Sequence, residues 1–71
     1  MNAKASAGLA MDYFPDVSKK QARRLFRQMV TKMGQKNPHF IEELEAVGFD
    51  ISDRYYTPLQ LQVLFRYVGE P

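Results

Sequence analysis

The fold is decided by one stretch, residues 18–34, which reads SKKQARRLFRQMVTKMG. Ser18 and Gln21 form a capping box, in which two side chains satisfy the free backbone N–H groups at the start of a helix. Apolar residues then recur at the spacing of one helix face. They are Ala22, Leu25, Phe26, Met29, Val30 and Met33. Gly34 is a natural end, because a left-handed terminating residue costs glycine nothing. The stretch therefore predicts an amphipathic helix over 19–33.

A shorter helix is expected before this one, over 7–14. Ser6 is placed to cap its start, and Pro15 stops it because proline cannot continue a helix. The preceding residues, 1–6, show no such pattern and are expected to be flexible. The chain of 71 residues has room for one domain, which we assign to 7–71.

The third helix is expected over 38–47. Asn37 is a cap residue, and Pro38 follows at the helix position where a missing N–H does no harm. Gly48 closes the helix in a Schellman motif, with Phe49 placed to contact the last turn. The side chains expected to face inward are Phe40, Ile41 and Leu44.

The fourth helix is expected over 58–68. Thr57 and Gln60 repeat the capping box, Pro58 occupies the first turn, and Gly69 follows the end. Apolar residues spread around most of its circumference, namely Leu59, Leu61, Val63, Leu64, Phe65, Tyr67 and Val68. Such a helix is either the central element of the fold or buries a second face against another chain, so a homodimer through it is one alternative.

The residues between the third and fourth helices, 50–56, hold no helical pattern and are expected to form a loop. Tyr55 and Tyr56 could stack on bases if exposed, but core packing is the better interpretation for both. The expected fold class is therefore all-α, a compact four-helix domain.

Composition excludes several classes of protein. The chain has no Cys, so disulfides and thiolate metal sites are excluded, and a reducing, cytoplasmic location is expected. Residues 1–8 lack the apolar core of a signal peptide. No run approaches the roughly 18 apolar residues that span a bilayer, so a soluble protein is expected.

Charge is arranged in two blocks. Between Ser18 and Lys36 the chain has seven Lys or Arg residues and no acid. The following residues, 37–53, contain five acids and no Lys or Arg: Glu42, Glu43, Glu45, Asp50 and Asp53. Opposed blocks can orient a charged ligand, or they can neutralise each other across the fold. The sequence leaves both alternatives open.

The candidate binding residues are the first five cations, Lys19, Lys20, Arg23, Arg24 and Arg27. Helical spacing turns their charges to solvent together, away from the apolar stripe. Lys19 and Lys20 sit in the first turn, where the helix dipole disfavours cations, so helix stability does not explain them. A phosphate would satisfy both these ammonium groups and the free N–H groups of the first turn.

The first two helices and the short turn between them have the lengths of a helix-turn-helix, whose second helix enters the DNA major groove by its N-terminal residues. The turn lacks the glycine often found there. We therefore expect a helix-turn-helix-like, DNA-binding protein, with DNA preferred over RNA. The alternatives are a solvated basic face without a partner, an acidic protein or anionic membrane as partner, and a protein interaction module. Membrane binding is disfavoured because the apolar face of this helix is committed to the core.

An enzyme is not expected. His39, with Glu42 and Glu43 one turn later, is the best candidate for acid–base or metal chemistry, and a solvated helix face is the better interpretation. Phosphate-binding glycine loops and nucleophile elbows are missing. No cofactor, metal or small-molecule substrate is expected.

Several short motifs together resemble a known family. They are Tyr13-Phe14-Pro15, Ala22-Arg23-Arg24-Leu25, Asn37-Pro38, Leu44 with Gly48-Phe49, Thr57-Pro58-Leu59-Gln60 and Gly69-Glu70-Pro71. The chain after Leu9 is similar to short domains of unknown function from Bacteroides-type bacteria, found near mobile elements. The resemblance brings no established activity. It implies a small regulator or accessory DNA-binding protein.

Overall fold

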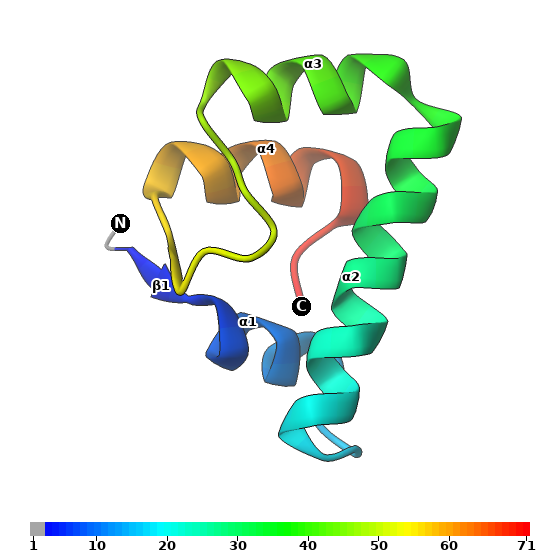
Figure 1. Ribbon diagram of the computed structural model, residues 1–71, viewed down its shortest axis with the longest axis vertical. Helices are drawn as coiled ribbons and strands as arrows, with labels where there is room; N and C mark the ends of the chain where they lie inside the picture. The colour runs from blue at the N-terminus through cyan, green and yellow to red at the C-terminus, as the bar shows by residue number, and fades with distance from the viewer. Residues whose placement is uncertain (1–2) are drawn as a thin grey trace.

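Four helices and one two-stranded sheet make up the computed structural model, which describes residues 3–71 (Figure 1). The helices are α1 (Ser6–Tyr13), α2 (Lys19–Lys36), α3 (Pro38–Ala46) and α4 (Pro58–Val68). The strands, β1 (Lys4–Ala5) and β2 (Tyr55–Tyr56), have two residues each. The expected mostly helical domain is confirmed.

The long helix α2 runs along one side of the molecule and joins its two ends (Figure 1). α1 packs against its N-terminal part, and α3 turns back from its C-terminal end to lie beside α4. The loop after α3 descends to β2, which pairs antiparallel with β1, and α4 then returns through the middle. The N-terminal end of α2 therefore lies far from α3.

The starts of α2 and α4 follow their capping chemistry. In α4 the Gln60 backbone N–H donates to the Thr57 hydroxyl at 3.3 Å, and the Thr57 N–H donates to Gln60 Oε1 at 3.0 Å. In α2 the Gln21 N–H donates to the Ser18 hydroxyl at 3.2 Å. The predicted starts of both helices and the predicted end of α4 are confirmed. The predicted capping box is complete in α4, whereas in α2 only its Ser18 half is present among the described residues.

The predicted end of α2 at Gly34 is wrong, since the helix continues to Lys36. Gly34 has a different purpose there. A Cβ at this position would lie 2.4 Å from Cδ1 of Ile41, so the missing side chain lets α3 fold back closely onto α2. Ile41 consequently lies over the helix surface and stays 39% exposed, which corrects its expected inward position.

We predict that Gly34→Ala and Ile41→Ala are coupled. In the Ile41→Ala background, Gly34→Ala should stabilise the protein by about 0.5–1 kcal/mol, because alanine is the better helix former. With Ile41 present the gain should shrink or reverse through the steric conflict. Urea unfolding of the two single variants and the double variant measures the coupling. Equal effects in both backgrounds would contradict the assigned role of Gly34.

The turn between α2 and α3 also differs in detail. Asn37 was expected to cap α3, but its side chain donates to Sδ of Met33 at 3.1 Å and makes no capping bond. Pro38 occupies the first turn as expected. Asn37 therefore occupies both the C-cap position of α2 and the N-cap position of α3. Its side chain bonds to α2 and not to the start of α3.

The Schellman termination of α3 is confirmed. The Phe49 N–H donates to the Leu44 carbonyl at 2.9 Å and the Gly48 N–H donates to the Glu45 carbonyl at 3.0 Å. Gly48 has φ 69°, a left-handed conformation that favours glycine. The helix ends at Ala46, one residue before the predicted end.

The N-terminal segment has more structure than the sequence indicated. Lys4 and Ala5 pair with Tyr56 and Tyr55 in the sheet, although both were assigned to a flexible segment, 1–6. Ser6 is the first residue of α1 and not its cap, and its buried N–H donates to the Arg54 carbonyl at 2.8 Å. Strands of two residues contain no alternation that sequence analysis could detect. Residues 1–2 lie outside the described residues.

The core is organised around α4. Its buried residues are Gln60, Leu61, Val63 and Leu64. Other elements contribute the fully buried Leu9, Phe40 and Tyr56. Among the large apolar side chains of α4, Leu59 is the exposed one. The chain itself thus accounts for the apolar excess of α4, and a homodimer through this helix stays a prediction.

The two tyrosines of β2 have opposite environments, because successive residues of a strand point to opposite faces. Tyr56 is 1% exposed, packs against the rings of Phe26 and Phe49, and donates its hydroxyl to the Ile51 carbonyl at 2.9 Å. Tyr55 is 65% exposed. Core packing is confirmed for Tyr56 and wrong for Tyr55.

The raised pKa values of the buried Tyr56 and the partly buried Tyr13 predict a loss of stability at alkaline pH. Burial, with a smaller contribution from Asp53, raises the pKa of Tyr56 to about 12, and burial with a contribution from Glu70 raises that of Tyr13 to about 12. A raised folded-state pKa means that stability is complete below pH about 10, the unfolded value, and falls as pH rises toward 12. Thermal unfolding followed by circular dichroism from pH 9 to 12 measures this loss. A melting temperature that stays constant over this range would contradict it.

Candidate nucleic-acid interface

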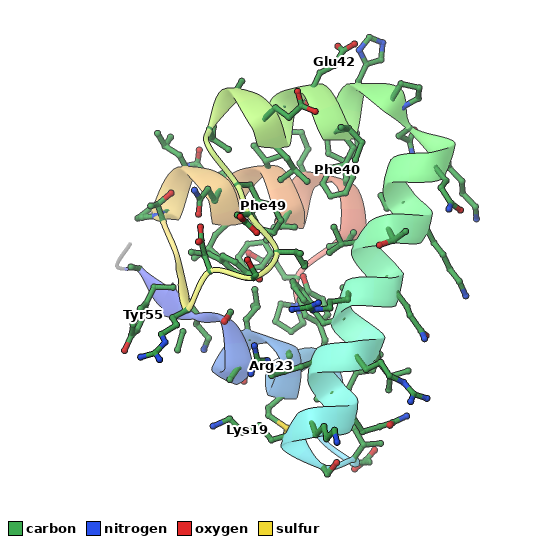
Figure 2. The ribbon with its side chains drawn as sticks, viewed as in Figure 1. Lys19, Arg23, Phe40, Glu42, Phe49 and Tyr55 are labelled. Atoms are coloured by element: carbon green, nitrogen blue, oxygen red, sulfur yellow. The ribbon has the colours of Figure 1, made fainter. Side chains whose placement is uncertain are left out.

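The five predicted site residues lie together at the N-terminal end of α2. We call Lys19, Lys20, Arg23, Arg24 and Arg27 the basic cluster; each of them is exposed. Together they line one open surface depression of about 540 Å³. Figure 2 shows Lys19 and Arg23 on the part of α2 that is remote from α3. The structure therefore brings together the whole predicted set.

The basic cluster forms no ion pair within residues 3–71. The ion pairs of this part of the chain join Lys4 to Asp12 at 2.7 Å, His39 to Glu42 at 3.4 Å and Arg66 to Glu43 at 2.5 Å. Five cations close together on one helix face repel each other, and an external anion would relieve that repulsion.

The acids of α3 do not cover the basic cluster. Glu43 accepts hydrogen bonds from Arg66 and from the Tyr67 hydroxyl, so it ties α3 to α4. The hydrogen bond between the Tyr67 hydroxyl and Glu43 raises the pKa of Tyr67, and burial raises it further. Glu42 lies at the outer surface of α3, at the opposite end of the molecule from Lys19 (Figure 2). Neutralisation of one block by the other, which the sequence left open, is therefore absent for these two glutamates.

The loop before β2, which carries Asp50 and Asp53, borders the basic cluster. Arg23 and Arg27 line a small crevice together with Ile51 and Tyr56, so their side chains border this loop. The pKa of Asp50 is lowered, chiefly by hydrogen bonds from the hydroxyl and N–H of Ser52 and to a smaller extent by the charge of Arg27. The loop therefore borders one edge of the basic cluster and leaves the outer edge open to solvent.

The outward surface of α2 continues past the basic cluster, which the sequence analysis missed. A second open depression is lined by Arg24, Arg27, Gln28, Thr31, Lys32 and Gln35. The last turn of this surface was not predicted because the helix was expected to end at Gly34. Its neutral polar residues were not predicted because the candidate site was chosen by charge. The signal in the sequence was the absence of acids over the whole of residues 18–36.

An apolar groove lies on another side of α2, where it meets α3. Its apolar lining comes from Val30, Gly34, Ile41, Leu44, Phe49 and Ile51, around a volume of about 450 Å³. This groove and the basic cluster are separate surfaces, because they share no lining residue.

The remaining candidates are dispersed. His39 lies on an exposed helix face, with Nδ1 3.4 Å from Glu42. Residues 3–71 contain no group of three or more His, Cys, Asp or Glu side chains that could hold a metal ion. Tyr55 lies on the side of the molecule away from α2 (Figure 2). No helix in the described chain is both long and apolar enough to cross a bilayer.

One comparison with known proteins gives a match. The family model described as "Domain of unknown function (DUF4248)" matches residues 1–71, the whole chain. Comparison with the curated proteins gives no match, and neither does comparison with the solved structures.

Proposed function

Because the chain belongs to this family of domains of unknown function, we propose its function from the surface of α2: it is a small, non-enzymatic DNA-binding protein. The observation that supports this most is the basic cluster, five exposed cations on one helix face that form no ion pair with any residue the structure describes. The proposed mode is helix-turn-helix-like, with α1 packed against α2 and the N-terminal end of α2 directed at the duplex.

The chemistry of this helix end suits a phosphodiester. The first-turn N–H groups of α2 are not all used within the helix, and the Ser18 hydroxyl accepts from only one of them, that of Gln21. A phosphate oxygen placed there accepts from the remaining N–H groups and from Lys19 or Lys20. Arg23, Arg24 and Arg27 then reach neighbouring phosphates or the O6 and N7 edge of a guanine.

Duplex DNA is proposed over RNA because of the shape of the basic cluster. The major groove of B-DNA admits an α-helix, whereas the deep and narrow major groove of A-form RNA excludes one. Single-stranded RNA is usually recognised by stacking on aromatic rings. The exposed aromatic side chain Tyr55 lies away from α2 and does not complement the basic cluster in this way.

We propose an accessory or regulatory role for this binding. The resemblance to domains found near mobile elements in Bacteroides-type bacteria is consistent with a small protein that acts on DNA beside larger enzymes. A cytoplasmic location, expected from the absence of Cys, gives access to that DNA.

The test is a titration of fluorescent duplex DNA with the wild type and with Arg23→Ala/Arg24→Ala/Arg27→Ala. We expect the triple variant to bind on the order of 100-fold more weakly at 0.1 M salt, because three phosphate contacts are lost. The control removes the three cations that lie outside α2, as Lys4→Ala/Arg54→Ala/Arg66→Ala. A comparable loss in both variants would show that net charge, and not the basic cluster, governs binding.

A second candidate function rests on the apolar groove between α2 and α3: the protein could be an interaction module for another protein. Ile41 lies in this groove and is 39% exposed. Coelution of a partner from lysate, lost on Ile41→Asp and kept in the Arg23/Arg24/Arg27 variant, would favour this function over DNA binding.

A further inference from the structure

A stripe of neutral and basic hydrogen-bonding residues begins within the basic cluster, at Arg24, and runs along α2 to Gln35. We call Arg24, Gln28, Thr31 and Gln35 the reading stripe; all four are exposed. At about 100° per residue they fall within about 60° of the helix circumference, so they form a narrow line parallel to the axis. The stripe extends over about 16 Å at 1.5 Å per residue.

The side chains of the reading stripe have no polar partner among the described residues, although Thr31 and Gln35 also border the apolar groove between α2 and α3. Within residues 3–71, none of its four side chains forms a hydrogen bond or ion pair with another residue. The exposed residues of α2 also include no acid, so the helix lacks the Glu–Lys pairs at i and i+4 that stabilise surface helices. Neither helix stability nor hydrogen bonding within the described residues accounts for this composition.

Cations flank the reading stripe on both sides. By helical position Lys20 and Arg27 lie on one side of it, and Lys32 and Lys36 lie on the other. A helix in a major groove about 12 Å wide has a phosphate backbone on either side of it and base edges in front. The arrangement of cation, polar stripe and cation matches that environment.

The side chains of the reading stripe are those that recognise bases. Arginine donates two hydrogen bonds to guanine, glutamine pairs with the N6 and N7 edge of adenine, and the threonine methyl contacts the thymine methyl. A line of about 16 Å covers about five base pairs at 3.4 Å each.

Building on the proposed function, we propose that α2 lies lengthwise in the major groove and that the reading stripe makes binding sequence-specific. In this proposal Gln28 and Gln35 determine sequence specificity, in addition to the phosphate contacts of the basic cluster. The cations on both flanks hold the helix in place through phosphates, and the stripe selects about five base pairs.

The experiment is selection from a pool of duplexes with a randomised centre, followed by titration of the selected site and a scrambled site. The variants are Gln28→Ala/Gln35→Ala and the control Gln62→Ala, which removes an exposed glutamine from α4. Alanine preserves helicity in each case. We expect the wild type and the control to prefer the selected site, and the double variant to lose about 10-fold or more of this preference. Affinity for the scrambled site should stay the same.

The outcomes separate this inference from the proposed function. Salt-sensitive binding without any enriched sequence overturns the reading stripe and leaves DNA binding intact. An enriched sequence that the double variant still prefers equally also overturns it. Absence of binding to every duplex, or tighter binding to an RNA pool, overturns both proposals.

Discussion

Raising the salt concentration from 50 to 200 mM should lower the affinity of the protein for duplex DNA about 500-fold. Each phosphate neutralised by a Lys or Arg releases condensed counterions, which gives a slope of about −0.9 per contact in a plot of log K against log salt. The five exposed cations of the basic cluster would give a slope of about −4.5. Fluorescence anisotropy of a labelled duplex at several salt concentrations measures this slope.

The control for this prediction is the slope of the Arg23/Arg24/Arg27 variant. With two cations of the basic cluster left, it should fall to about −1.8. The charge-matched variant at Lys4, Arg54 and Arg66 should retain a slope near that of the wild type. A wild-type slope of about −1 would mean that the basic cluster does not contact phosphates as a group.

Phe40→Ala should destabilise the protein by about 3–5 kcal/mol, the usual cost of emptying a buried phenylalanine site. Phe40 is 0% exposed, and its ring centroid lies 4.9 Å from that of Tyr67, where α3 packs on α4. A domain of 71 residues has a total stability of about 4–11 kcal/mol. One substitution would therefore remove about a quarter or more of it. Urea unfolding followed by circular dichroism gives the value.

The matched control is Ile41→Ala, on the same helix and next in sequence. Ile41 is 39% exposed, so its truncation should cost about 1 kcal/mol. Equal losses for the two variants would show that Phe40 does not lie in the cooperative core around α4.

The helices that could be predicted best are those whose ends are set by local chemistry. α4 has a capping box, a first-turn proline and a closing glycine within its own sequence, and its predicted bounds are confirmed. The predicted end of α2 was wrong because Gly34 does not terminate the helix. It makes room for a tertiary contact with Ile41, seven residues further along the chain. The sheet was missed because two short strands, over fifty residues apart, define each other only by pairing.

The composition of the site could be predicted, but not its surroundings. Helical spacing was enough to predict that the basic cluster is exposed. The apolar stripe of the same helix packs on the core, so the five cations must face solvent. Whether the acids of α3 would cover it depended on partners remote in sequence. Glu43 found Arg66 and Tyr67 on α4, 23 and 24 residues away, and no local pattern indicates such pairs.

The most direct measurement of the central claim is an amide NMR map of the protein with and without duplex DNA. We expect the shifts to concentrate on the exposed residues of α2 from Lys19 to Gln35, with Ile41, Leu44 and Phe49 on the other wall of the apolar groove unchanged. Shifts centred on Ile41 and Phe49, or no shifts at saturating duplex, would contradict it.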